Sequence, residues 1–192
     1  MKIDIIDNYI NLLKTTLDNL SRQEVLQFAL LLEEARVKGK KIFVFGNGGS
    51  GSTASHLACD INKGVSLGLD QRYRVMALTD NLPIILAYAN DTTYDDVFVE
   101  QLANFLEQGD IVVGISGSGN SRNIIRAIEY ANERNNTTVG ITGFQGGKLK
   151  QLATVSVNAH VDDMQVSEDI HMILVHILMK VLYEHTRSTE VA

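Results

Sequence analysis

The sequence predicts an α/β fold, with a doubly wound, mainly five-stranded parallel sheet flanked by helices. From residue 41 onwards, short runs rich in Val and Ile alternate with helical stretches. These runs are apolar throughout, which is typical of strands buried on both faces of a parallel sheet. The chain has 192 residues and is 45% apolar, which is enough for a buried core. We therefore expect a single domain over residues 1–192.

The first 39 residues predict two helices that precede any strand. Apolar residues recur at steps of three and four over residues 2–20, which indicates one amphipathic helix. Ser21 and Glu24 then form a capping box, and Gly39 ends the second helix. We expect residues 1–39 to be a helical extension, and residues 40–185 to hold the α/β core and a C-terminal helix.

The core elements follow from the same alternation. Strands are predicted over residues 41–45, 73–78, 111–115, 137–141 and 154–157. Helices are predicted over residues 53–63, 82–88, 94–107 and 122–134. Each crossover between parallel strands is expected to be right-handed.

The last predicted helix, residues 167–185, is unusually apolar. Eleven of the fourteen residues from Ile170 to Tyr183 are apolar. Such a helix must be buried on several sides. Two explanations stay open: burial against another subunit, or a central position within one chain.

Composition excludes several classes of protein. The chain has 17 Lys and Arg against 23 Asp and Glu, a net charge of -6, which argues against sequence-independent nucleic-acid binding. The single cysteine, Cys59, rules out an intrachain disulfide and is expected in the core. No apolar run reaches the ~20 residues of a membrane span, and the N-terminus lacks a signal pattern. We expect a cytoplasmic protein without nucleic-acid or membrane partners.

A glycine-rich loop follows the first predicted strand. It contains Asn47, Gly48, Gly49 and Ser50, and a helix is predicted after it. Glycines let the backbone approach a ligand, and a helix N-terminus offers free N–H groups to an anion. The loop lacks the patterns of phosphate-binding ATPases and of dinucleotide-binding folds, so we expect no nucleotide cofactor. A simple tight turn is the alternative.

A serine-rich loop follows the third predicted strand. Ser116, Gly117, Ser118 and Ser121 lie at a second strand-to-helix turn. Hydroxyl groups and backbone N–H groups at a helix start suit a phosphate monoester. A capped turn without a ligand is the alternative. Both loops follow the carboxyl ends of parallel strands, so we expect them to converge on one crevice.

Together these motifs resemble one family. The segments GNGGSGSTASH, GISGSGNS, ITGFQGGKL and EDIHMILVHIL, with Asn90 and Asp91, are similar to the SIS (sugar isomerase) domain family. Their order and spacing most closely resemble the bacterial phosphoheptose isomerases, which act on sedoheptulose 7-phosphate. The resemblance covers nearly the whole chain. It implies that the serine-rich loop holds a sugar phosphate. It also implies that the sugar is lined by Asn47, Gly48, Gly49, Ser50, Asn90, Asp91 and Glu168.

The resemblance also implies a divalent metal, most plausibly zinc. The matching positions are His56, Asp60, Glu168 and His176. Asp60 stands where the family has Glu, and Glu168 stands where it has Gln. Because Asp is one methylene shorter, its carboxylate reaches ~1.5 Å less far. Glu168 and His176 would lie about 12 Å apart on one regular helix, so either the helix begins after Glu168 or a neighbouring subunit supplies one ligand.

The implied reaction is aldose–ketose isomerisation of a seven-carbon sugar phosphate through an enediol, with the metal assisting. Catalytic roles are expected for Asp60, His176 and Glu168, and which carboxylate is the base stays open. The resemblance further implies a homotetramer with active sites at subunit interfaces. Two alternatives remain: an isomerase of another phosphosugar, and a non-catalytic phosphosugar-binding or regulatory protein.

Overall fold

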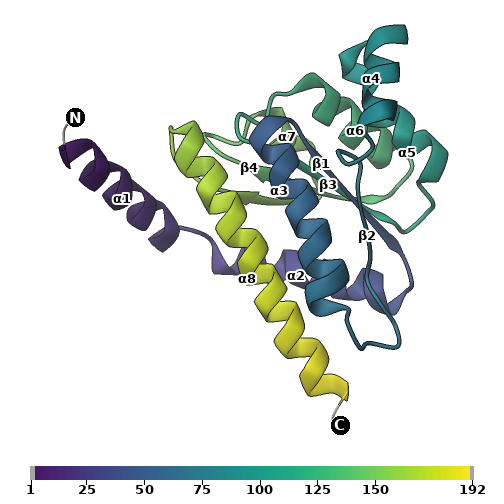
Figure 1. Ribbon diagram of the computed structural model, residues 1–192, viewed down its shortest axis with the longest axis horizontal. Helices are drawn as coiled ribbons and strands as arrows, with labels where there is room; N and C mark the ends of the chain where they lie inside the picture. The colour runs from purple at the N-terminus through teal and green to yellow at the C-terminus, as the bar shows by residue number, and fades with distance from the viewer. Residues whose placement is uncertain (1–2, 191–192) are drawn as a thin grey trace.

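The computed structural model, which describes residues 3–190, has one parallel sheet between two layers of helices (Figure 1). The strands are β1 (Lys41–Gly46), β2 (Arg74–Ala77), β3 (Ile111–Ser116), β4 (Thr137–Thr142) and β5 (Val155–Asn158). The predicted fold class is confirmed, and each predicted strand is found within one residue. The expected helix start at Lys2 and the outer bounds of the predicted domain lie outside the described residues.

The helices follow the predicted order, with one additional short helix over residues 147–152, and the helices predicted over residues 53–63 and 94–107 are each divided in two. Their bounds are α1 (Ile3–Asp18), α2 (Arg22–Val37), α3 (Gly48–Cys59), η1 (Asp60–Val65), α4 (Leu82–Asp91), η2 (Tyr94–Asp96), α5 (Val99–Phe105), α6 (Arg122–Glu133), α7 (Gly147–Leu152) and α8 (Met164–Glu190). The predicted N-cap is confirmed, because the Ser21 side chain accepts a hydrogen bond from the Glu24 backbone N–H.

The sheet separates two hydrophobic clusters. Successive residues of β1 point to opposite faces, as the period of a strand requires. Ile42 and Val44 join the cluster formed with α2, α3 and α8, whereas Phe43 and Phe45 join the cluster formed with α5 and α6. Both faces of the central strands are therefore covered, which explains why their sequences are apolar throughout.

The strand order places a topological switch beside β1. The order is β2-β1-β3-β4-β5, and all neighbouring pairs are parallel. The chain therefore leaves β1 towards one edge of the sheet and returns on its other side through β3. Gly46 pairs with Ile115, so β1 and β3 end at the same level. In such sheets ligands bind beyond the carboxyl ends of the two strands at the switch.

Helix α3 begins five residues before the prediction. The glycines and serines of residues 48–52 have weak helix propensity, but packing of α3 against β1 and α8 outweighs it. Helix α8 begins at Met164, so Glu168 and His176 lie on the same helix. This excludes the expectation that the helix begins after Glu168. After α3 the helix widens into η1, where the Ser66 N–H bonds to the carbonyl of Ile61.

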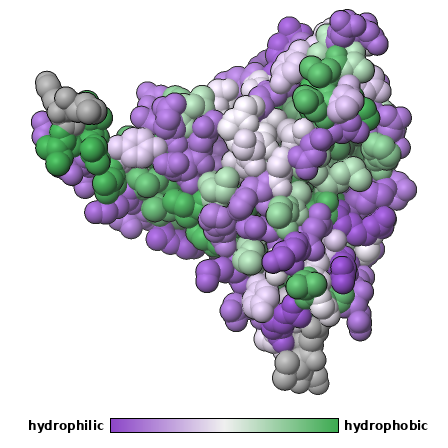
Figure 2. Space-filling model, in the orientation of Figure 1, coloured by the Kyte–Doolittle hydropathy of each residue, from purple (hydrophilic) through white to green (hydrophobic). Residues whose placement is uncertain are grey.

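Helix α8 is buried along one face, and α1 extends away from the body of the molecule (Figure 1). Apolar surface runs along α1 towards α8 (Figure 2). A groove of about 420 Å³ lies where α1, α2 and α8 meet. Its apolar lining is Leu17, Leu20, Val25, Leu26, Ala29, Ile177 and Val181. Within residues 3–190, no helix combines the length and apolar character that a bilayer span requires.

His171 lies on the buried face of α8, in the core. Its side chain is 1% exposed, and neither ring nitrogen has a hydrogen-bond partner of good geometry. Burial lowers the pKa of His171 below its ordinary value. The backbone of Thr142 raises the pKa, but by less than burial lowers it. The imidazole is therefore neutral in the folded protein at neutral pH.

We predict that His171 makes the protein less stable in mild acid. Below pH 6.5 the unfolded chain binds a proton at this position and the folded protein does not, so stability falls as pH falls. Between pH 7.5 and 5.5 the free energy of unfolding should drop by about 1 kcal/mol more in the wild type than in His171→Leu. Urea unfolding at the two pH values measures this. Identical pH dependence in both proteins would contradict a buried neutral imidazole.

Candidate functional site

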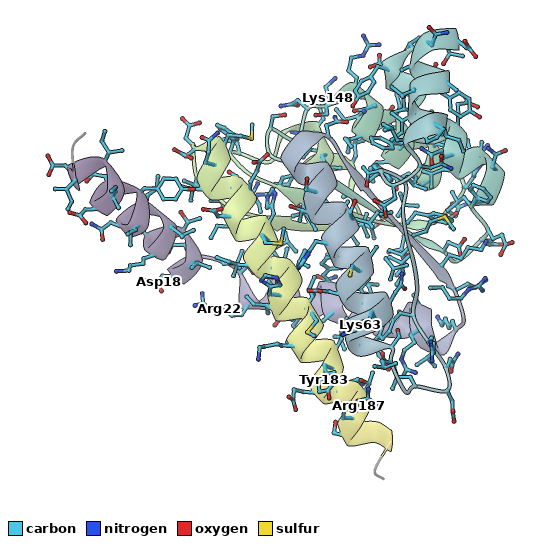
Figure 3. All side chains as sticks on the ribbon, viewed as in Figure 1. Asp18, Arg22, Lys63, Lys148, Tyr183 and Arg187 are labelled. Atoms are coloured by element: carbon cyan, nitrogen blue, oxygen red, sulfur yellow. The ribbon has the colours of Figure 1, made fainter. Side chains whose placement is uncertain are left out.

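The two predicted loops meet at a cavity of about 290 Å³, beyond the carboxyl ends of β1 and β3. The cavity is lined by Asn47, Gly48, Gly49, Ser50, Ile115, Ser116, Gly117, Ser118, Ser121, Met164 and Glu168. The prediction that the loops converge on one crevice is confirmed. Sequence reasoning did not identify Ile115 and Met164 as part of the lining. Figure 3 shows Lys148 at the same end of the molecule, near the start of α3.

The two helices that begin at this cavity lack side-chain caps. Asn47 and Ser121 are the N-cap residues of α3 and α6, and neither side chain makes a capping hydrogen bond. Elsewhere the same residue types do cap, as Ser21 does for α2 and Asn81 for α4. The first N–H groups of an α-helix have no partner within the helix. The cavity is therefore bordered by two helix N-termini, each suited to an anion.

The serine-rich loop is held in shape by its own hydrogen bonds. The Ser116 hydroxyl accepts from the Gly119 N–H at 3.1 Å and lies 3.2 Å from the Ser121 hydroxyl. The Asn120 N–H donates to the Ser118 hydroxyl at 3.2 Å. These bonds hold the hydroxyls in place without a ligand, which reduces the conformational entropy lost when a ligand binds.

The loop after β4 supports the serine-rich loop from behind. The Gly143 N–H donates to the carbonyl of Gly117 at 2.8 Å, and the Leu149 N–H donates to that of Gly119 at 2.9 Å. The backbones approach so closely that a Cβ atom on Gly119 would lie 2.0 Å from the carbonyl oxygen of Gly146. Only glycine fits there, and its φ of 66° is also one that other residues rarely adopt.

Asn47 is bonded to two residues that sequence reasoning missed. Its amide exchanges two hydrogen bonds with the amide of Asn123, and its Oδ1 also accepts from the Tyr94 hydroxyl at 2.9 Å. Asn123 lies in the first turn of α6, so the amide pair joins the two loops directly. The sequence carries no signal for this pair, because 76 residues separate its members.

Three of the four predicted metal ligands lie together on the seam between α3 and α8. One ligand atom each from His56, Asp60 and His176 lies within 4.8 Å of the others. The Nε2 atoms of the two histidines are 3.0 Å apart, and His56 Nε2 is 3.3 Å from the Asp60 carboxylate. Two imidazoles and a carboxylate form the mixed N/O donor set that zinc prefers, and three protein ligands leave a position open. The donor set fits a divalent metal.

Glu168 is separate from this cluster. It lines the cavity near the start of α3, where a Cβ atom on Gly49 would meet its carboxylate at 2.6 Å. From Glu168 to His176 the helix rises about 12 Å. Within the described chain, Glu168 therefore lies with the predicted substrate residues rather than with the metal ligands.

The structure does not bring Asn90 and Asp91 to the cavity. Both are exposed at the C-terminal end of α4, where the Asn90 amide donates to the Asp91 carboxylate. Neither lines the cavity described above. Helix α4 itself buries no residue in this chain, although its sequence is largely apolar.

The prediction that Cys59 lies in the core is wrong, because Cys59 is exposed. Residues 54, 57, 58 and 61 carry the buried face of this helix, so residue 59 lies on the side that faces away from the sheet.

Comparisons with known proteins agree with this architecture. The sequence profile of the SIS domain matches residues 6–143. The chain is 37% identical over 158 residues to the phosphoheptose isomerase of Geobacter metallireducens, covering 80% of this chain and 81% of that protein. It is 32% identical to the phosphoheptose isomerase of Helicobacter pylori (strain P12), covering 90% and 89%.

A solved structure gives the same result in three dimensions. The phosphoheptose isomerase GmhA from Neisseria gonorrhoeae superposes with a TM-score of 0.84 at 27% identity, covering 93% of this chain and 95% of that chain. The likeness therefore includes the helical extension and α8 as well as the sheet.

Gly119→Ala should damage the serine-rich loop. The new Cβ would overlap the backbone of Gly146 and force an unfavourable φ, at a cost of about 2 kcal/mol or more in the free energy of unfolding. Gly64→Ala is the matched control, because its Cβ would meet only the flexible end of Met179 and should change stability by less than about 1 kcal/mol. Urea unfolding of both variants measures the difference. If the two variants had the same free energy of unfolding, the close contact between the serine-rich loop and the loop after β4 would be contradicted.

Proposed function

Because this chain belongs to the SIS domain family and, within it, to the phosphoheptose isomerases, we propose that it isomerises sedoheptulose 7-phosphate to D-glycero-D-manno-heptose 7-phosphate. The observation that carries the proposal is that two helix N-termini, whose N-cap side chains do not cap them, meet at one cavity with the three hydroxyls of the serine-rich loop. Ser116, Ser118 and Ser121 bind the phosphate group of the substrate, together with the N-termini of α3 and α6.

The distance from the cavity to the histidine cluster suits a long sugar. Helix α3 rises about 10 Å from Gly49 to His56, and α8 rises about 12 Å from Glu168 to His176. An open-chain heptulose 7-phosphate spans about 9 Å from phosphorus to its second carbon, because each bond of about 1.5 Å advances the chain somewhat less than its length. With the phosphate in the cavity, the first two carbons therefore approach His56, Asp60 and His176.

The reaction moves one proton between neighbouring carbons. A base removes a proton from the carbon beside the carbonyl group, which leaves an enediolate. An acid returns a proton at the former carbonyl carbon, and the hydroxyl proton of the first carbon passes to the former carbonyl oxygen. We assign Asp60 and His176 as the proton-transfer pair, because they belong to the same cluster. With a metal held there, each would transfer a proton only through the carboxylate oxygen or ring nitrogen that does not bind the metal. Glu168 remains the alternative base. Its place beside Gly49 favours a role in binding sugar hydroxyls, which can donate to its carboxylate.

We propose that His56, Asp60 and His176 hold a divalent metal, most plausibly zinc. When bound, it would supply a Lewis acid for the oxygens that gain negative charge in the enediolate. The chain's own residues align the substrate: the phosphate cavity fixes one end, and the side chains along the α3–α8 seam face the other. Binding energy from the phosphate can then be used to orient the reacting carbons.

We further propose a homotetramer with active sites at subunit interfaces. The support is apolar surface that one chain leaves uncovered: Ile3, Ile6 and Ile10 on α1 are exposed, and the groove of α1, α2 and α8 is open beside them. Figure 3 places Asp18 and Arg22 at the rim of this groove. Asn90 and Asp91 do not line the cavity of their own chain, so a role in binding the sugar would require the cavity of a neighbouring subunit. The single cysteine suits the cytoplasm, which we propose as the location.

The substrate assay is the direct test of the function. Purified protein of known metal content should turn over sedoheptulose 7-phosphate faster than other ketose phosphates. His176→Ala should lower kcat by a factor of about 100 or more, because proton transfer is lost. Ser118→Ala should mainly raise KM, because its hydroxyl binds a part of the substrate that does not react. Turnover that survives in His176→Ala would remove the proposed role, and a wild type inactive on every ketose phosphate would favour a binding protein.

The proposed assembly depends on the groove. Leu26→Glu should dissociate the tetramer, because it places a charge on an apolar contact surface at a cost of several kcal/mol in the assembly. Leu67→Glu is the control, since Leu67 is exposed outside the groove. Size-exclusion chromatography with light scattering gives the mass of each protein. A monomeric wild type, or a Leu26→Glu variant of unchanged mass, would contradict the proposal.

A further inference from the structure

We propose that Tyr94 and Asn123 are positioning residues, which hold the Asn47 amide so that it offers a single hydrogen-bond donor to the substrate. The inference rests on the proposed function, because it assigns how that site recognises its sugar phosphate. It adds two residues and one recognition rule to the site.

The hydrogen-bonding capacity of Asn47 is almost fully used within the protein. Asn47 Nδ2 donates to Asn123 Oδ1 at 3.0 Å, and Asn123 Nδ2 donates back to Asn47 Oδ1 at 2.8 Å. The Tyr94 hydroxyl donates to the same Oδ1 at 2.9 Å. An asparagine side chain has two N–H donors and an oxygen with two lone pairs. Both lone pairs and one N–H are occupied, so one N–H is left.

The Asn47 side chain does not make the hydrogen bond that is usual for an asparagine at its position. Asn47 is the N-cap of α3, where an asparagine oxygen normally accepts from the first turn of its own helix. Here that oxygen is turned to Tyr94 and Asn123 instead. The exchange leaves the N–H groups of α3 for a ligand and fixes the amide at the wall of the cavity.

Both partners are themselves held in place. Asn123 is 2% exposed in the first turn of α6. Tyr94 begins η2, and the two residues after it form ion pairs with α6: Asp95 with Arg122 at 3.1 Å, and Asp96 with Arg126. Tyr94 itself is 52% exposed. Its hydroxyl therefore contributes through the bond to Asn47 rather than through core packing.

The recognition rule follows from the remaining N–H. Asn47 can donate to a ligand but has no free lone pair to accept from one. The matching group on the substrate is an oxygen that accepts, such as a carbonyl, a hydroxyl oxygen or a phosphate oxygen. A protonated amino group at the same place could only donate and would be rejected.

A double-mutant cycle on turnover tests whether Tyr94 acts through Asn47. Tyr94→Phe removes only the hydroxyl and should raise KM for sedoheptulose 7-phosphate about threefold to tenfold with kcat nearly unchanged, as expected for one neutral hydrogen bond. In the Asn47→Ala background the same substitution should change KM by less than about 1.5-fold, because the bond is already absent. Tyr88→Phe, on α4, is the matched control and should leave KM unchanged. An equal effect of Tyr94→Phe in both backgrounds, or no effect in the wild type, would overturn the inference.

A second measurement needs no ligand and separates this inference from the proposed function. In the free protein, the side-chain amide protons of Asn47 are observed by NMR. Tyr94→Phe should speed exchange of the protected Asn47 amide proton by about threefold or more, because the amide pair opens more often. Unchanged exchange would overturn the positioning role. A wild type that does not turn over sedoheptulose 7-phosphate, with the exchange effect present, would reject the function and retain the role of Tyr94.

Discussion

The N-cap side chains at the starts of α3 and α6 make no capping hydrogen bond, and this feature organises the rest of the site. Each helix begins with a residue type that commonly caps, yet Asn47 and Ser121 direct their side chains elsewhere. The sheet brings the two helix starts together, because β1 and β3 are neighbours at the point where the strand order reverses. Both helix N-termini therefore border one cavity, where their dipoles and the serine hydroxyls would stabilise an anion.

The same helices connect binding to chemistry. Helices α3 and α8 pack along each other (Figure 1), with Gly49 against Glu168 at one point and His56 against His176 two turns further on. A rigid pair of helices thus keeps the anion cavity and the histidine cluster at a fixed separation. In the proposed function, a substrate would present its charged end and its reactive end about 10 Å apart, so that the site would select for chain length as well as for charge.

Local sequence patterns predicted much of this arrangement, and long-range contacts account for what they missed. The strands could be predicted because buried parallel strands are apolar throughout, and the two loops because glycine and serine follow β1 and β3. The early start of α3 was missed because tertiary packing overrides the weak propensity of Gly48 and Gly49. Tyr94 and Asn123 were missed because their roles arise only from contacts made across the fold. The exposed position of Asn90 and Asp91 at the end of α4 was missed because it depends on where the fold places α4 relative to the cavity.

The central claim is that one substrate joins the cavity to the histidine cluster. A crystal structure of the protein with zinc and sedoheptulose 7-phosphate, recorded with anomalous data at the zinc edge, tests it most directly. The account predicts phosphate density against Ser116, Ser118 and Ser121, and an anomalous peak bounded by His56, Asp60 and His176 with the first carbons of the sugar beside it. Phosphate bound elsewhere, or a sugar whose reactive end points away from His176 in every subunit of the assembly, would contradict it.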